Sequence, residues 1–323
     1  MAILRTVYDL GRFSKIVPRD VPDFSLHFSD TDAGFGVEIV EAYPSESHAR
    51  LLNVRNYATK LFAGEPHIHK DDVNRIPVTE VTVTDKDGNV KHERMRVILD
   101  EQTPKQKIGD RLAETINAKS EKHATYANDY RHVNLVIYCH EYDGPAPDKQ
   151  STLENLLTRN LLKELNSSPF NEVFVTSTCP GADEVYQPLR LLALIEASYL
   201  FVHALRDFDG IFNLTDKDQF ASIFVRAARA GGIHADYALD GDAPIANYGG
   251  VGVRFSDEGI QILDHNDYRS PVPQDLPDSG LDSETLDKIL ETYIDFRLNN
   301  NFLGPISFPA VTNIRDSMNH AER

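Results

Sequence analysis

The chain has 323 residues, 41% of them hydrophobic, and 33 Lys and Arg against 50 Asp and Glu give it a net charge of −17. This length predicts one large domain or two ordinary ones, and the hydrophobic content excludes a disordered chain. No apolar run reaches the roughly 18–20 residues that span a bilayer, which argues against a membrane protein. Because the start of the chain lacks a secretory signal pattern, we expect a cytoplasmic protein.

The acidic charge favours solubility and disfavours loose, non-specific binding to DNA. A group of carboxylates around a divalent cation is acidic as well. The net charge therefore argues against non-specific DNA binding but does not decide which reaction, if any, the protein catalyses.

The first third of the chain predicts two β-hairpins. Apolar and polar residues alternate over 21–28 and again over 35–42, and six turn-forming residues separate the two runs. A second alternating pair covers 78–84 and 90–99 around a short polar turn. We interpret the second hairpin, near 78–99, as an insertion.

The middle of the chain predicts alternating helices and strands. Apolar residues at helical spacing predict an amphipathic helix over 104–126. An almost continuous apolar run at 133–139 predicts a strand buried on both faces. A helix at about 152–165, a buried strand at 172–177 and an apolar helix within 189–205 follow. This order predicts an α/β fold with a mixed central sheet flanked by helices.

The last third carries weaker signals. Helices are expected over 219–230 and 283–298, and a short hairpin over 249–264. We divide the chain into an α/β domain at 1–206 and a C-terminal α+β extension at 207–323, mostly helical and of unknown role.

Two acidic residues stand out in the first predicted hairpin. Asp23 follows Pro22 at the start of one strand, and Glu38 lies in the next strand, 15 positions later. Adjacent antiparallel strands bring such residues within cross-strand reach. Two converging carboxylates are costly without a cation, and Mg²⁺, or Mn²⁺, suits a site with few carboxylates and several waters.

The order of these motifs resembles the PD-(D/E)XK nuclease superfamily over about residues 18–180. The resemblance is to variants in which the lysine of the third motif is displaced onto the following helix. In this chain Glu38-Ile39-Val40 stands at that motif, so Val40 occupies the lysine position. The helix before the buried strand offers Lys119 and Lys122 instead.

The resemblance implies a restriction-endonuclease-like core and Mg²⁺-dependent hydrolysis of phosphodiester bonds in nucleic acid. It implies that Asp23, Glu38 and the backbone carbonyl of Ile39 hold the metal. It also implies that Lys119, or else Lys122, orients the attacking water or stabilises charge on the phosphate. Nucleic acid is then the expected partner, alongside a second protein chain or a second copy of this one.

The alternative is a catalytically inactive nuclease-fold protein that serves as a protein-interaction module. The acidic surface and Val40 both favour it. In addition, the acidic residue that the family usually carries on a helix before the first strand has no good match, because residues 1–17 offer only Asp9. Glu41 receives no role.

A second metal candidate lies outside these motifs. His67 and His69, with Asp71 and Asp72, are side-chain types that bind transition metals and would support a small-molecule hydrolase. Their flanks resemble a loop, so the favoured interpretation is an ordinary surface loop.

Three further features have plainer interpretations. The run 249–252 resembles a piece of a phosphate-binding loop but predicts a tight turn. The run 264–267 contains metal-capable side chains and is also ordinary turn sequence. Cys139 is expected in the core, and Cys179 has no histidine at a spacing that would make it a nucleophile.

Overall fold

The computed structural model describes residues 2–29, 33–98, 106–126, 130–140, 156–177, 185–208, 216–256, 259–263, 270–299 and 308–309. The chain divides into two compact units. The first comprises Met1–Glu41 and Lys105–Arg323, and the second comprises Ala42–Pro104. These units do not coincide with the division at 206/207 drawn from the sequence.

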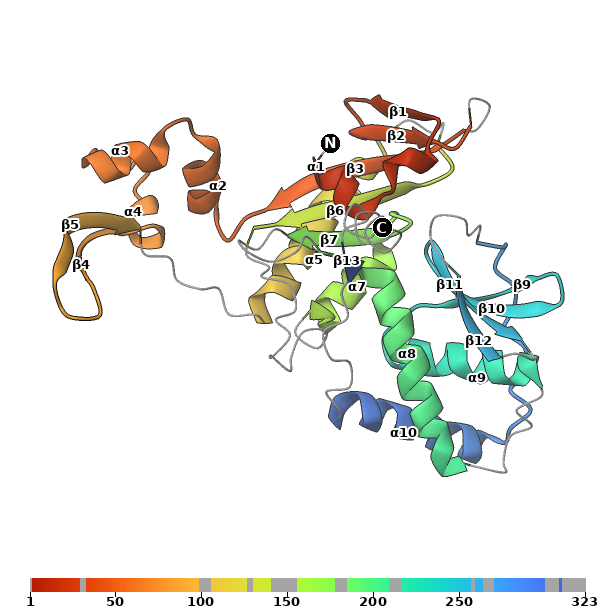
Figure 1. Ribbon diagram of the computed structural model, residues 1–323. Coiled ribbons are helices and arrows are strands. Elements are labelled where there is room, and N and C mark those ends of the chain that lie inside the picture. Colours follow the sequence, from red (N-terminus) through yellow and green to blue (C-terminus); the bar gives the residue numbers. More distant parts are fainter. Residues whose placement is uncertain are drawn as a thin grey trace, which may run out of the picture. The chain divides into compact units, whose positions relative to one another are not determined.

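The first unit is built on a seven-stranded sheet (Figure 1). Its strand order is β1-β2-β3-β6-β7-β8-β13. The pairs β1/β2, β2/β3, β7/β8 and β8/β13 are antiparallel, and β6/β7 is parallel. The sheet is therefore mixed, and the predicted fold class is confirmed. The strands are β1 (Lys15–Pro18), β2 (Phe24–His27), β3 (Phe35–Ala42), β6 (Val133–Cys139), β7 (Val173–Ser177), β8 (Val185–Pro188) and β13 (Phe308–Pro309).

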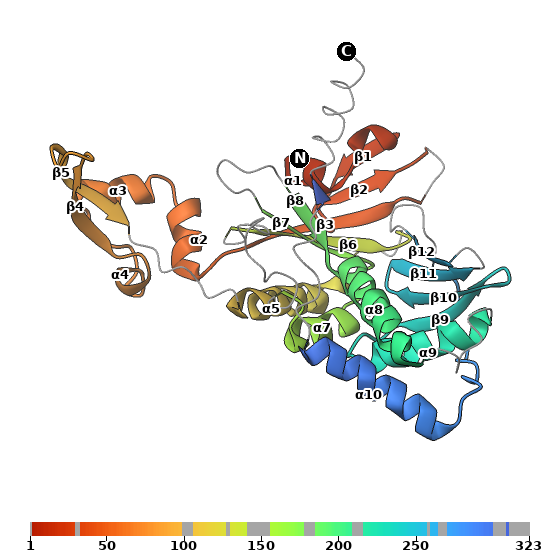
Figure 2. The same ribbon diagram turned by 60° about the horizontal axis from the view of Figure 1, so that its bottom comes forward.

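Helices cover both faces of this sheet (Figure 2). One face carries α1 (Ala2–Val7), followed by the short helix η1 (Leu10–Arg12). The opposite face carries α5 (Gln106–His123) and α7 (Arg159–Ser167), which pack against each other. The core beneath α1 consists of Leu4, Val7, Tyr8, Leu26, Phe35, Val37, Val136 and Phe174.

The predicted elements of the middle region are largely confirmed, because their signals were long or strongly apolar. The strand predicted at 133–139 is β6, in which all residues but one are fully buried, as expected between two helical layers. Seven of the ten buried apolar residues in α8 (Leu189–Leu205) are leucine or phenylalanine, and the helix is buried on most sides. The helix expected at 152–165 begins later, as α7, and residues 152–155 lie outside the described part.

The C-terminal region contains a second sheet beside its helices. Helix α9 (Lys217–Ala230) packs on this sheet, and α10 (Ser283–Asn299) packs on α8 and α9. A short helix, η2 (Arg206–Phe208), follows α8. The sheet is an antiparallel four-stranded one, so the region is α+β rather than mostly helical. Its order is β12-β11-β10-β9, with β9 (Asp236–Asp240), β10 (Ala243–Tyr248), β11 (Val251–Ser256) and β12 (Gly259–Leu263).

The second unit contains the predicted hairpin and three helices that the sequence analysis did not predict. The hairpin strands are antiparallel with two register shifts. A small core of Tyr57, Leu61 and Ile76 joins the parts of the unit. Its elements are α2 (Glu46–Asn53), α3 (Tyr57–Ala63), α4 (Asp72–Arg75), β4 (Val78–Thr84) and β5 (Val90–Ile98).

No helix in the described ranges combines the length and the apolar composition that a bilayer-spanning segment needs.

Candidate functional site

Strand β3 divides its side chains between the two helical layers. Phe35 and Val37 belong to the core beneath α1. Because side chains alternate along a strand, Glu38 points to the other face, where α5 lies. Glu38 is buried there, with 7% of its surface exposed. A buried carboxylate needs a hydrogen-bonded or charged partner.

The partner of Glu38 is Lys119 of α5. The Lys119 ammonium Nζ lies 2.5 Å from Glu38 Oε1, and the two side chains are 20% and 9% exposed. The two residues are 81 positions apart in the sequence. The packing of α5 on this face of the sheet therefore brings the predicted lysine to the predicted carboxylate.

Asp23, which directly precedes β2, lies next to Glu38. Phe24 pairs with Val37 in the β2/β3 register, which places Asp23 level with Glu38 one position beyond the last pair. The Asp23 carboxylate Oδ2 accepts a hydrogen bond of 2.7 Å from the Ile39 backbone N–H. In a strand, the N–H and C=O of one residue point to the same neighbour, so the Ile39 carbonyl is directed toward the side of Asp23.

A buried tyrosine lies beside the two carboxylates. Tyr126 follows α5 and is 6% exposed. Burial, together with the negative charges of Glu38 and Asp23, raises the pKa of the Tyr126 hydroxyl well above its usual value. Among the described residues, this buried hydroxyl makes no hydrogen bond of normal geometry. It is a protonated donor held beside two carboxylates.

The structure separates the other residues considered from this group. Lys122 is exposed, and its backbone carbonyl caps the turn at Thr125. Val40 shares the face of Glu38 by alternation and carries no charge. Glu41 lies 3.6 Å from the His140 ring, and Asp9 caps η1 through the Gly11 N–H.

These geometries make the group suitable for a hard divalent cation. Two carboxylates and one carbonyl are oxygen ligands of the kind that Mg²⁺ takes, together with several waters. Within the described residues, no set of three or more His, Cys, Asp or Glu could hold a metal. A cation at Asp23 and Glu38 would therefore keep open positions, and Lys119 would have to leave Glu38 or share it.

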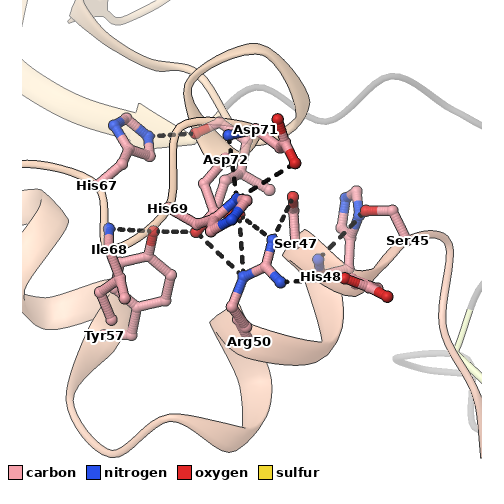
Figure 3. A network of polar contacts seen from close by, with 12 residues as sticks. Ser45, Ser47, His48, Arg50, Tyr57, His67, Ile68, His69, Asp71 and Asp72 are labelled. Atoms are coloured by element: carbon pink, nitrogen blue, oxygen red, sulfur yellow. Dashed lines mark hydrogen bonds and ion pairs between the residues drawn. The ribbon is translucent and has the colours of Figure 1, made fainter.

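The second unit contains the other buried carboxylate of note (Figure 3). Asp72 is fully buried and accepts hydrogen bonds from Arg50 Nη2 at 2.6 Å and from the Tyr57 hydroxyl at 2.6 Å. Burial by itself would raise the pKa of Asp72, but the hydrogen bonds from Arg50 and Tyr57 outweigh it and hold this pKa well below its usual range. The Tyr57 oxygen in turn accepts from the Ile68 N–H.

The histidine candidates of this unit have other partners (Figure 3). His67 Nε2 lies 3.1 Å from the Ile76 carbonyl oxygen, and His69 Nδ1 lies 3.2 Å from Asp71 Oδ2. Asp72 forms an ion pair with Arg50. The alternative of a metal group formed by two histidines and two aspartates is therefore not seen, because these residues contact other partners among the described residues.

The remaining candidates have structural roles or fall outside the described residues. Cys139 is buried in β6, as predicted. Residues Gly249 and Gly250 form the two-residue turn between β10 and β11, which confirms the tight-turn interpretation. Cys179 and the run 264–267 lie outside the described residues.

Sequence reasoning missed the role of Tyr126 and the Arg50–Asp72 pair. Tyr126 carries no motif of its own, and only the fold of α5 against β3 places it at the carboxylates. The pairing of Arg50 with Asp72 spans 22 residues and gives no local pattern. Comparisons with protein families, with curated proteins and with solved structures find no match to this chain.

Proposed function

We propose that this protein is a Mg²⁺-dependent phosphodiester hydrolase acting on nucleic acid, with its site at Asp23, Glu38 and Lys119. The observation that carries the proposal is the contact of the Lys119 ammonium with Glu38, beside Asp23. Three residues from two strands and a later helix were singled out for one chemistry, and they converge on one face of the sheet. The motif resemblance supports the same assignment.

In this proposal each side chain has a distinct task. Asp23, Glu38 and the Ile39 carbonyl hold the cation, which when bound polarises the phosphate and makes a coordinated water more acidic. Lys119 donates to the attacking water or to a phosphate oxygen and stabilises the negative charge that develops there. The Tyr126 hydroxyl, kept protonated by its neighbours, is available to donate a hydrogen bond to a group bound beside the carboxylates.

The test is metal-dependent cleavage of single-stranded and duplex DNA and RNA. We expect cleavage with Mg²⁺ or Mn²⁺ and its loss in Asp23→Asn and in Glu38→Gln. Lys119→Met should lower the rate by about 10²–10³-fold, the usual cost of removing one donor to a transition-state anion. Glu41→Gln is the matched control, because Glu41 lies on the same strand and contacts His140 instead.

The two lysines are compared directly in the same assay. Lys122→Met should retain cleavage, since the Lys122 side chain is exposed. Loss of cleavage in Lys122→Met with full activity in Lys119→Met would move the role to Lys122. Equal activity of wild type and both carboxylate variants would refute the proposed site.

The second candidate function is a nuclease-fold interaction module without catalysis. The specific observation in its favour is that the Lys119–Glu38 pair satisfies both charges without a metal. Thermal unfolding with and without Mg²⁺ separates the two. A ligand present at about 100 times its Kd stabilises a fold by about 2.7 kcal/mol. A stabilisation of this kind that Glu38→Gln abolishes supports the metal site, and no stabilisation supports the module.

A further inference from the structure

A cleft of about 470 Å³ lies in the first unit, with Tyr126 in its wall. The last residue of α5, residues 126 and 130–133, the segment between α7 and β7, the start of α8 and the second sheet contribute to it. Its volume falls within the range of about 300–1,000 Å³ typical of small-molecule sites. None of Asp23, Glu38 or Lys119 lines it among the described residues, so it is a separate cavity that shares Tyr126 with the carboxylate group.

The cleft is basic although the chain is acidic. Two arginines, Arg131 and Arg190, and three histidines line it. Among its described lining residues the one carboxylate is Asp236, and Arg229 Nη2 lies 3.4 Å from that carboxylate. In a chain of net charge −17 this local excess of cations favours an anionic ligand.

Arg190 forms a fixed cation in the wall. It is 3% exposed, and its Nη2 donates to the Ser168 carbonyl at 3.0 Å and to the Phe170 carbonyl at 3.1 Å. Its guanidinium lies 4.7 Å from the centre of the Tyr248 ring. Its Nε–H has no hydrogen-bond partner among the described residues. A buried donor without a partner calls for an explanation, and a bound anion supplies one.

Aromatic rings form much of the remaining lining. Tyr126, Tyr130, Phe170 and Tyr248 all contribute. The His123 ring packs edge-on against Phe170 at 5.3 Å, and burial lowers the pKa of His123, so that its neutral ring persists to lower pH. Aromatic faces next to arginines are the combination on which nucleic-acid bases stack.

The walls of the cleft are tied together before any ligand binds. Asn166 Oδ1 accepts from the His234 N–H at 3.1 Å and from the Tyr248 hydroxyl at 3.0 Å. At Gly249, where φ is +63°, a Cβ atom would lie 2.6 Å from Arg190 Cδ. The glycine thus lets the β10–β11 turn approach the arginine. A preformed cavity lowers the ordering cost of binding.

We propose that this cleft binds a nucleoside phosphate, with the base stacked among the aromatic rings and the phosphate at Arg131 and Arg190. The ligand is either a free nucleotide or one nucleotide of a single strand. The second source rests on the proposed function, because it makes the cleft a substrate subsite next to the carboxylates. Duplex is disfavoured, since a duplex base must leave its stack and its pairing partner before it can enter the cleft, which costs free energy.

The experiment measures binding without cleavage, using wild-type protein in a chelator of divalent cations. The probes are adenosine monophosphate, uridine monophosphate, adenosine, inorganic phosphate and a labelled single-stranded octanucleotide, followed by calorimetry or fluorescence polarisation. We expect the nucleotides to bind at least about tenfold more tightly than adenosine or phosphate alone, because the base and the phosphate each contribute. Binding by the mononucleotides identifies the free ligand, and binding by the octanucleotide alone identifies the strand.

Two variants and one control locate the binding. Arg131→Ala should weaken nucleotide binding about tenfold or more, the usual effect of losing a bond to a charged group. Tyr130→Leu should reduce nucleotide affinity to that of phosphate. Arg5→Ala, at an exposed position of α1 outside the cleft, should change nothing. Circular dichroism and the unfolding temperature verify that each variant folds.

Several results would overturn the inference. These are no binding by any nucleotide, equal binding of phosphate and nucleotide, or the same loss in Arg131→Ala and Arg5→Ala. The inference and the proposed function fail separately. If nucleotides bind but neither wild type nor Glu38→Gln shows metal-dependent cleavage, the inference about the cleft holds and the proposed nuclease function is refuted. If the protein cleaves nucleic acid but binds no nucleotide, the proposed function holds and the inference is refuted.

Discussion

Glu38 in the first unit and Asp72 in the second are buried carboxylates that each pair with a cation, but the two pairs differ in completeness. Asp72 in the second unit accepts hydrogen bonds from two nitrogens of Arg50, Nε and Nη2, and from the Tyr57 hydroxyl. Glu38 in the first unit contacts the Lys119 ammonium at 2.5 Å. The hydroxyl of nearby Tyr126 forms no hydrogen bond of normal geometry with a described residue.

The difference separates a structural polar network from a candidate site. A buried carboxylate whose oxygens already accept their full set of hydrogen bonds stabilises one arrangement of its neighbours and has no lone pair available for a ligand. Two carboxylates beside a single ammonium, as at Glu38, Asp23 and Lys119, retain negative charge and free lone pairs, which a cation can use. The completeness of the hydrogen bonding is therefore a better guide to function in this protein than burial alone.

The largest expected effect is on the Asp72 network. Asp72→Asn leaves the Arg50 guanidinium without its anion, and Arg50 is 24% exposed, so the cost lies near the lower end for a broken buried pair, about 3 kcal/mol. Hydrogen exchange of amides in α3 and β4 should show this loss of stability. Asp71→Asn, at an exposed neighbouring position, is the control and should change exchange little. Equal effects of both variants would mean that the network is not what stabilises the unit.

The next largest expected effect is the difference in unfolding free energy between Tyr57→Phe and Tyr126→Phe. Tyr57→Phe removes a hydrogen bond to a buried carboxylate and should lower the free energy of unfolding of the second unit by about 1–3 kcal/mol. Tyr126→Phe removes a buried hydroxyl that makes no such bond and should leave unfolding of the first unit unchanged, or make it slightly harder. Denaturant unfolding of both variants measures the contrast. A loss of more than about 1 kcal/mol in Tyr126→Phe would show that its hydroxyl is already satisfied.

The stability of the second unit at low pH gives a further test of the Asp72 network. Because the pKa of Asp72 is lowered in the folded state, its contribution to stability is complete above the pKa of an unfolded aspartate and is lost as the pH falls below it. The second unit should lose up to about 1.4 kcal/mol per pH unit from this group between about pH 4 and pH 2. Hydrogen exchange at stepped pH should show a shallower loss in Asp72→Asn. An unchanged slope would assign the acid sensitivity to other groups.

The smallest expected effects concern the helix caps of the two units. Ser45 Oγ accepts from the His48 N–H at the start of α2, and Thr158 Oγ1 accepts from the Leu161 N–H at the start of α7. Ser45→Ala and Thr158→Ala should each cost about 1 kcal/mol. Hydrogen exchange should place the first loss in the second unit and the second loss in the first. A loss spread over both units in either variant would mean that they unfold together.

Much of the fold could be predicted because its signals are local. The apolar run 133–139 became β6 without change of bounds, and the alternation over 78–99 became β4 and β5. The helices α2, α3 and α4 were not predicted because they are four to eight residues long and mostly exposed. Strands β9 and β10 were not predicted either.

The sequence by itself determined the alternation of strands and helices, and it supplied Asp23, Glu38 and Lys119 as candidates for one chemistry. Only the tertiary structure decided that Lys119, rather than Lys122, reaches Glu38, and that Tyr126 lies beside both carboxylates. It alone showed the basic cleft and the Arg50–Asp72 pair. The physical reason is that periodicity and turn residues act over a few positions, whereas a contact across 81 residues depends on how a helix packs on a sheet.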